Sequence, residues 1–309
     1  MGNFTPHPGQ PVPWSLISYR NGPAASIAVL RPDGVVVAPP ELKQWETMLD
    51  LLDDWDAAEP VLREVRFEGA PTVTAEKLLP PLRYPRKLIC AGVNYRRHIQ
   101  EMGAEIPAEG WRPFFFLKPP TTTVVGPDDP IVVHDPEVTR YDWEAELAVI
   151  IGRGGRAIPV TEALDHVAAY AVANDVTARG RHKRTVVPGA PFVYDWVASK
   201  AIDSSFPMGP GLTPAFFVPD PQDLRLKLWV NDEPQQDETT ADMICTVAEL
   251  IAEASQVMTL QPGDVIATGT PAGVGAPRGR FLRDGDVVRV TIDGLGAIQN
   301  TVHEPGAEA

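Results

Sequence analysis

The chain has 309 residues, 44% of them hydrophobic, which is enough to bury a large core in one large domain or two unequal ones. A formal net charge of −14 without any basic run argues against nucleic acid and anionic membranes as partners. The two cysteines, Cys90 and Cys245, lack CxxC spacing, which argues against a disulfide framework or a thiolate zinc site. No stretch approaches the roughly 20 apolar residues of a membrane helix, so we expect a soluble, cytoplasmic protein.

The N-terminal part is predicted to form a small α+β unit. Residues 16–39 are typical of two strands around the turn at 31–34. Residues 41–64 have helical spacing, with one apolar stripe made of Trp45, Met48, Leu51, Leu52 and Trp55. The proline-rich segment 78–85 interrupts regular structure. We therefore predict a small N-terminal domain over 1–80 and a larger domain over 81–309.

The larger domain is predicted to be rich in strands. Strands are expected at 145–151, 168–176 and 224–230, and a helix is expected at 243–258; the segments 262–266 and 284–292 each begin with a turn that leads into a strand. Helices are few, and strands do not alternate regularly with them. This pattern favours a β-rich α+β fold over a doubly wound sheet.

Two acidic residues, Glu144 and Glu146, alternate in the segment 141–152, which contains the strand predicted at 145–151. Alternate side chains of a strand share a face, and their Cα atoms lie about 7 Å apart, so both carboxylates can reach one ion. The alternative is a strand with one solvated face. Ala148 and Ile150 continue the same face and argue against it, because two buried, unpaired glutamates would cost several kcal/mol each.

A third acidic candidate, Asp175, closes the strand predicted at 168–176. An Asn-Asp pair at a strand end also commonly makes a turn, so this residue alone does not decide between the two roles. Three carboxylates without cysteine or paired histidine would favour a hard cation, Mg²⁺ or Mn²⁺.

His98 and Glu101 are three residues apart in a predicted short helix and share one face. A carboxylate can fix the tautomer of an imidazole and stabilise its protonated form, as a general base requires. The alternative is a routine His–Glu pair on a surface helix.

Lys200, Arg179 and Thr270 are single polar residues in apolar or glycine-rich surroundings. The loop 268–275 could present backbone N–H groups to an anion, or simply connect two strands. It lacks the GK[ST] ending of a P-loop, which argues against nucleotide binding.

The order and spacing of these segments resemble the fumarylacetoacetate hydrolase superfamily, including its acylpyruvase-like members. The matching segments are 92–101 (Gly-x-Asn-Tyr-x-x-His-x-x-Glu), 116–119 (Phe-Leu-Lys-Pro), 142–147 (Asp-Trp-Glu-Ala-Glu-Leu), 174–179 (Asn-Asp-Val-Thr-Ala-Arg), the segment around Lys200, 260–266 and 268–275. The resemblance implies a β-rich catalytic fold, a mixed β-sandwich or roll, preceded by a small N-terminal α+β domain. It also implies a homodimer.

The resemblance assigns roles to residues of this sequence. Glu144, Glu146 and Asp175 would bind the metal, His98 and Glu101 would activate water, and Lys200 would assist catalysis. Arg179, His182, Thr270 and Gly269 would bind the substrate. The chain departs from the family pattern at Gly180, where a carboxylate is common, and at His182, which replaces an amide. The apolar and aromatic stretch 188–197 is also unusual.

The implied reaction is metal-dependent hydrolysis of a carbon–carbon bond in a 2,4-dioxo acid, such as an acylpyruvate or a fumarylacetoacetate-like substrate. One alternative keeps the fold: decarboxylation of an oxaloacetate-like acid, or hydration or isomerisation of an unsaturated oxo acid. A remote alternative is a non-catalytic protein that binds a small molecule.

Overall fold

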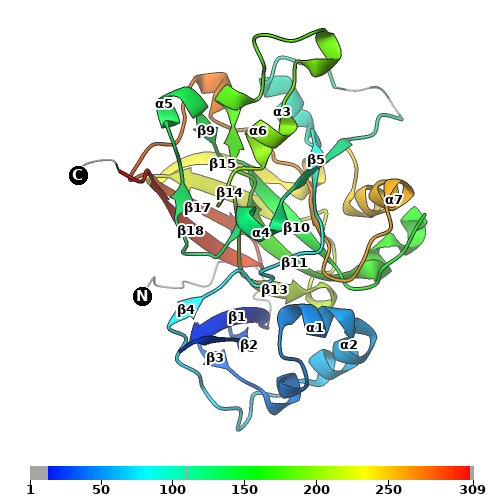
Figure 1. Cartoon of the computed structure of the whole chain (residues 1–309). Coiled ribbons are helices and arrows are strands. Elements are labelled where there is room, and N and C mark those ends of the chain that lie inside the picture. The colour runs from blue at the N-terminus through cyan, green and yellow to red at the C-terminus, as the bar shows by residue number, and fades with distance from the viewer. Residues whose placement is uncertain (1–12, 107, 109, 307–309) are drawn as a thin grey trace.

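The first elements of the chain form the lower lobe in Figure 1. The structure, a computed structural model, describes residues 13–106, 108 and 110–306. The lobe contains β1 (Ser15–Asn21), β2 (Ala24–Leu30), β3 (Val36–Val37), α1 (Met48–Asp53), α2 (Trp55–Glu64) and β4 (Lys77–Leu78). Through Leu16 and Leu212, β1 pairs with a strand of the main sheet, β13 (Phe206–Pro214). Because this pairing joins the N-terminal strands to the main sheet, the predicted domain boundary at residue 80 stays a prediction.

The prediction of one continuous helix over 41–64 is wrong, because the segment forms three separate helical elements. A 3-10 turn over Pro40–Gln44 comes first, and Thr47 then starts α1 with a capping box to Asp50. The chain breaks again at Asp54 before α2 begins. The predicted apolar stripe is nevertheless buried in full. The strands predicted over 16–39 are three, because the chain also turns at Gly22 between β1 and β2.

An 11-stranded, mostly antiparallel sheet runs through the centre of the molecule. Beside β1–β4 and β13 it contains β11 (Val167–Asn174), β10 (Ala145–Ile151), β16 (Val265–Ala267), β5 (Leu88–Gly92), β6 (Phe114–Lys118) and β7 (Val124–Val125). The strand predicted at 145–151 is confirmed, and the one predicted at 168–176 ends at Asn174. Every residue of β10 and β11 is buried, because both faces of these strands are covered.

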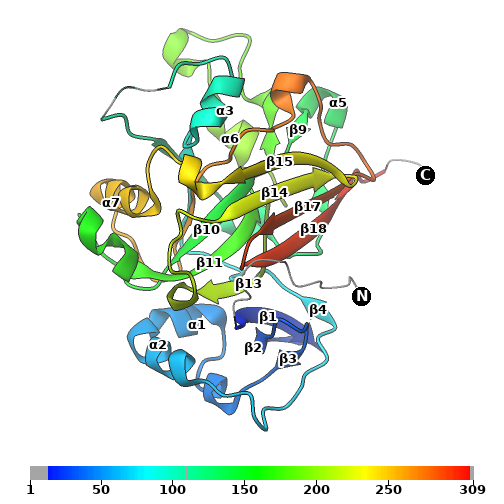
Figure 2. The same ribbon diagram turned by 180° about the vertical axis from the view of Figure 1, so that it is seen from behind.

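A second, five-stranded sheet covers one face of β10 and β11 (Figure 2). It consists of β15 (Glu233–Thr239), β14 (Arg225–Val230), β17 (Val287–Ile292), β18 (Gly296–His303) and β8 (Ile131–Val132). Leu147 and Val149 share a core with Leu228 and Val290 on this side. On the opposite face, Ala148 and Ile150 share a core with residues of α1 and α2. The predicted β-rich α+β fold is confirmed.

The remaining elements are short. They are α3 (Arg96–Glu101), α4 (Pro120–Thr123), α5 (Pro136–Thr139), α6 (Trp196–Lys200), α7 (Val247–Val257), and the paired strands β9 (Tyr141–Asp142) and β12 (Thr177–Ala178). Instead of starting at 243 as predicted, α7 starts after Thr246, which caps it by a capping box with Glu249. Among the described residues, no helix has the length and apolarity needed to cross a membrane.

Candidate metal centre

Three buried carboxylates meet where β10 and β11 pair. Glu144 precedes β10, Glu146 lies within it, and Asp175 follows the last residue of β11. The Asp175 N–H donates to the Glu144 carbonyl at 2.9 Å, which holds the two strand ends together. One oxygen from each carboxylate lies within 4.8 Å of the others. The cluster thus offers only oxygen ligands, the type that Mg²⁺ and Mn²⁺ prefer.

Three cations surround this cluster, and each is tied to a carboxylate. Lys200 Nζ lies 2.6 Å from Glu144 Oε2 and 2.7 Å from Asp175 Oδ2, so it bridges the two. Lys118 Nζ lies 2.5 Å from the other oxygen of Asp175. Arg179 Nη2 donates to Glu144 Oε1 at 2.7 Å. Burial alone would raise the pKa of Glu144, but Lys200 and Arg179 lower that pKa to about 2.

Glu146 is the member of the cluster without a cation. Within the described part of the chain it makes no ion pair, and its one hydrogen bond comes from the Gly269 N–H at 2.9 Å. Burial raises the pKa of Glu146 well above its ordinary value, and the nearby charges of Asp175 and Glu144 raise it further. A buried, uncompensated carboxylate beside two others is the environment in which a divalent cation fits.

Asp142 is a fourth buried carboxylate, placed behind Arg179. Its Oδ2 accepts from Arg179 Nε at 2.9 Å, and its two oxygens also accept the N–H groups of Gly275 and Ala276 at 2.7 and 3.0 Å. Burial raises the pKa of Asp142, although Arg179 opposes this shift. Arg179 is therefore held between Asp142 and Glu144. With four carboxylates against three cations, the ionised cluster carries one net negative charge before a metal binds.

The His98–Glu101 pair forms as predicted, on α3. His98 Nδ1 lies 2.6 Å from Glu101 Oε1, and the His98 side chain is buried. The other carboxylate oxygen, Oε2, accepts the Gly273 N–H at 2.8 Å. Because Nδ1 is engaged, Nε2 is the ring nitrogen left for a substrate.

One small pocket of about 120 Å³ brings the predicted site residues together. Glu101, which pairs with His98, is outside the lining. All the other predicted site residues line the pocket: His98, Glu144, Glu146, Asp175, Arg179, His182, Lys200, Gly269 and Thr270. Their metal-binding, catalytic and substrate-binding roles stay predictions, but their convergence from distant segments is a property of the fold.

Two of these residues make contacts that narrow their roles. The Thr270 hydroxyl donates to the Ala145 carbonyl at 2.9 Å, so its proton is already used. His182 Nδ1 lies 3.2 Å from the Ser199 hydroxyl, and the ring packs edge-on against Trp196. Burial lowers the pKa of His182, and the nearby charges of Arg179 and Lys200 lower it further, so the surroundings of this ring favour its neutral form.

Sequence reasoning assigned no role to three supporting residues. Lys118 lies in the segment 116–119 and Asp142 in the segment 142–147, both of which match the family. A single charged residue next to an apolar strand was the signal that could have indicated a role for each. Gln236 on β15 gave none. It is buried, its Oε1 accepts the Ala145 N–H at 2.9 Å, and its Nε2 donates to Thr270 Oγ1 at 2.9 Å. Side chains from two other segments thus fix the peptide between Glu144 and Glu146.

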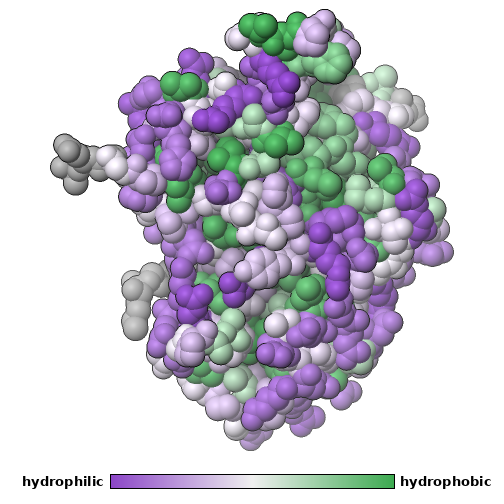
Figure 3. Space-filling view, in the orientation of Figure 1, coloured by the Kyte–Doolittle hydropathy of each residue, from purple (hydrophilic) through white to green (hydrophobic). Residues whose placement is uncertain are grey.

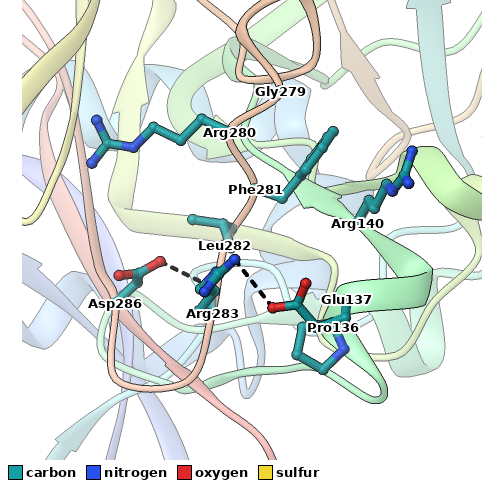
Figure 4. Close-up of a pocket in the computed structure, with 9 residues that line it drawn as sticks. All are labelled: Pro136, Glu137, Arg140, Gly279, Arg280, Phe281, Leu282, Arg283 and Asp286. Atoms are coloured by element: carbon teal, nitrogen blue, oxygen red, sulfur yellow. Dashed lines mark hydrogen bonds and ion pairs between the residues drawn. The ribbon is translucent and has the colours of Figure 1, made fainter.

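A larger hollow of about 650 Å³ lies elsewhere, next to α5 (Figure 4). Three arginines line it, but Arg283 pairs with Glu137 at 3.1 Å and Arg280 pairs with Glu233 at 2.5 Å. In Figure 4 the side chains of Arg140 and Arg280 point in opposite directions. Because these arginine side chains do not converge on one point, the hollow does not form a binding site for an anionic substrate.

Comparisons with known proteins found a matching family model, related sequences and similar solved structures. Residues 87–303 match the family model described as Fumarylacetoacetate (FAA) hydrolase C-terminal. The chain is 38% identical over 265 residues to "Oxaloacetate tautomerase FAHD2A, mitochondrial" of Bos taurus, covering 83% of this chain and 80% of that protein. The solved fumarylacetoacetate hydrolase of Exiguobacterium antarcticum has a TM-score of 0.79 and 35% identity, covering 94% of this chain and 99% of that one. Maleylpyruvate hydrolase from Sphingobium sp. SYK-6, solved with manganese(II) and pyruvate, has a TM-score of 0.73 and 31% identity at the same coverage.

Proposed function

The chain is an enzyme of the fumarylacetoacetate hydrolase family, and we propose that it interconverts the keto and enol forms of a 2-oxo acid, with oxaloacetate as the first substrate to test. One observation carries the proposal: a carboxylate-oriented histidine and a buried cluster of three carboxylates line the same small pocket. Keto–enol exchange needs a base at C3 and a cation at the 2-oxo group, and this pocket offers a place for both. The name of the Bos taurus relative supports the same reaction.

In this proposal Glu144, Glu146 and Asp175 hold Mg²⁺ or Mn²⁺. When bound, such a cation acts as a Lewis acid that polarises the 2-oxo group and makes the C3 protons more acidic. Lys200 bridges Glu144 and Asp175 and so holds these two carboxylates next to each other in the pocket. Because the ionised cluster has one net negative charge, a divalent cation makes it positive, and an anionic oxo acid is then attracted.

His98 is the proposed base. Glu101 fixes the ring tautomer through Nδ1 and stabilises the imidazolium that forms when Nε2 takes the C3 proton. The bond from Gly273 to Glu101 prevents the carboxylate from rotating away. In the reverse direction the same imidazolium returns the proton to C3. Such a group typically contributes about 10²–10⁴-fold in rate.

Hydrolysis of a 2,4-dioxo acid is the second candidate. The observation that favours it is the aromatic part of the pocket, where Phe114, Phe116 and Trp196 lie beside the polar cluster and offer room for an apolar acyl group. It additionally requires a water held between His98 and the distal carbonyl. Decarboxylation of oxaloacetate would use the same polar cluster but needs no base, since loss of CO₂ itself leaves the enolate of pyruvate, which then takes a proton from water.

The three reactions separate in one experiment. Freshly dissolved enol-oxaloacetate is mixed with purified protein and Mg²⁺ or Mn²⁺, the ultraviolet absorption of the enol is followed, and pyruvate is measured in parallel. Tautomerisation predicts a faster loss of enol without pyruvate. Pyruvate released from oxaloacetate at the rate of enol loss would instead establish decarboxylation. A higher kcat/KM for pyruvate release from a 2,4-dioxo acid would establish hydrolysis.

A further inference from the structure

One half of the pocket lining, next to the carboxylate cluster, is aromatic. Phe114 and Phe116 on β6 and Trp196 at the start of α6 line it. The rings of Phe116 and Trp196 are stacked, with centroids 5.2 Å apart and planes at 22°. Phe114 lies 4.8 Å from Trp196 and covers Gly92, where a Cβ atom would come within 2.7 Å of its ring. In Figure 3 apolar side chains gather over this part of the surface, around α6 and β5.

Among the described residues, no cation beside these rings is left to pair with a second carboxylate: Lys200 Nζ lies 5.1 Å from the centroid of the Phe116 ring but already pairs with two carboxylates. Among the described residues that line the pocket, each of the two cations is already paired: Lys200 with Glu144 and Asp175, and Arg179 with Asp142 and Glu144. Lys118 is buried behind Asp175, and Lys183 stacks over Tyr194 outside the lining. His182 offers a hydrogen bond, and burial and the neighbouring charges of Arg179 and Lys200 disfavour its protonated form.

The aromatic half favours some 2-oxo acids over others according to the distal group, which is the substituent on C3. Desolvating the second carboxylate of oxaloacetate against aromatic rings, with no partner cation, costs free energy on the scale of kcal/mol. An aromatic ring in the same place gains contact area and offset or edge-on stacking with Phe116 and Trp196. Shape and charge of the aromatic half therefore favour a flat, uncharged distal group.

We propose that the enzyme takes 2-oxo acids that carry an aromatic ring on C3, such as phenylpyruvate, in preference to oxaloacetate. This inference rests on the proposed keto–enol exchange. In that exchange the C3–H bond breaks and an O–H bond forms at the 2-oxo oxygen. The double bond moves from C2=O to C2=C3: His98 takes the proton from C3, the 2-oxo oxygen receives a proton from water, and His98 then returns its proton to that water's hydroxide. No oxidant, reductant or second substrate is consumed.

The catalytic test compares enol-to-keto conversion of phenylpyruvate and oxaloacetate at saturating Mn²⁺. The expected kcat/KM is about tenfold or more higher for phenylpyruvate. Trp196→Ala is expected to lower this preference about tenfold, mainly through KM. Val197→Ala is the matched control, because Val197 is 72% exposed and outside the pocket lining, and it leaves the preference unchanged. Met102→Arg places a cation at the pocket and should shift the preference toward oxaloacetate.

A binding test stands apart from turnover. Phenyllactate and malate carry the same two distal groups on a 2-hydroxy acid that cannot form an enol. Titrated into Mn²⁺-loaded protein in a calorimeter, phenyllactate should bind about tenfold more tightly than malate, and Trp196→Ala should remove the difference. Equal or tighter binding of malate overturns the inference, even if both oxo acids react. Tight phenyllactate binding without turnover of either oxo acid overturns the proposed function and leaves the aromatic specificity standing.

Discussion

The Gly273 N–H donates a hydrogen bond of 2.8 Å to Glu101, the residue that orients His98. Gly273 belongs to the loop that also sends the Gly269 N–H to Glu146 and the Gly275 N–H to Asp142. One loop thus holds the proposed base and the carboxylate cluster in a common frame. A shift of this loop should disturb both functions together.

Gly273→Ala is expected to destabilise the protein and to lower activity. Gly273 has φ of +105°, and a Cβ atom there would lie 2.1 Å from the Gln235 carbonyl oxygen, so the loop must move. Gly279→Ala is the matched control: Gly279 has φ of +64° but open space around it, and should cost only about 1 kcal/mol. Thermal unfolding measures both. Equal losses in the two variants would mean that the contact with Gln235 does not constrain the loop.

His98→Ala is expected to reduce keto–enol exchange by about 10²–10⁴-fold with little change in metal affinity. Glu101→Gln should lose a large part of the same factor, and the double variant should lose little more, because the two residues act as a unit. Decarboxylation of oxaloacetate should be much less affected. His303→Ala, an exposed histidine outside the pocket, serves as the control. Full exchange activity in His98→Ala would remove this pair from the mechanism.

Glu146→Gln is expected to abolish binding of Mg²⁺ and Mn²⁺ without destabilising the metal-free protein. Burial and two neighbouring carboxylates make the charge of Glu146 costly, so a neutral amide is tolerated while the ligand is lost. In wild type, metal at about 100 times Kd should add about 2.7 kcal/mol to the free energy of unfolding, and the variant should lose this gain. Calorimetry and thermal unfolding in chelator and in metal test both statements. Retained affinity would exclude Glu146 from the ligand set.

The ion pairs of Glu59 on α2 predict a pH-dependent contribution to stability. Partial burial raises the pKa of Glu59, but hydrogen bonds from Arg153 at 2.7 Å and Arg63 at 2.6 Å lower it to a net value below the ordinary one. A carboxylate whose pKa is lower in the folded than in the unfolded protein stabilises the fold at pH values above its unfolded pKa. This stabilisation is lost as the pH falls through the folded pKa.

Glu59→Gln should therefore cost about 0.2–1 kcal/mol at pH 7, and the difference from wild type should vanish in acid. Glu64→Gln at the end of the same helix, without an ion pair among the described residues, provides the control. Urea unfolding at several pH values gives the comparison. A difference that persists unchanged in acid would point to packing and not to charge.

The local part of the candidate site was predictable from the sequence. Strand alternation puts Glu144 and Glu146 on one face without any tertiary information, and a three-residue helical spacing does the same for His98 and Glu101. The buried strand that begins after Glu144 was equally clear, because both of its faces are covered and its residues are therefore mostly apolar. The helix over 41–64 was less clear, since apolar spacing continued through two capping positions at Thr47 and Asp54.

The remaining contacts depend on distances that only the folded chain defines. Gln236 reaches Ala145 across 91 positions, from a strand of the other sheet, and its own surroundings carry no mark of this role. Arg179 was expected to contact substrate, yet two of its nitrogens bind Asp142 and Glu144. A sequence motif can show that a residue such as Arg179 belongs to the site, but it does not show which side chains that residue contacts.

The central position of β10 and β11 has a consequence for partial unfolding. These strands are paired on both edges and covered on both faces, so their amides should exchange with solvent only when the whole chain unfolds. In contrast, α3 has six residues and no side-chain cap at its start, and such a helix opens at a much lower free energy. A locally opened molecule would keep its carboxylate cluster and its metal while its base is displaced. Hydrogen exchange should then reveal a metal-loaded but catalytically silent population, in equilibrium with the active one.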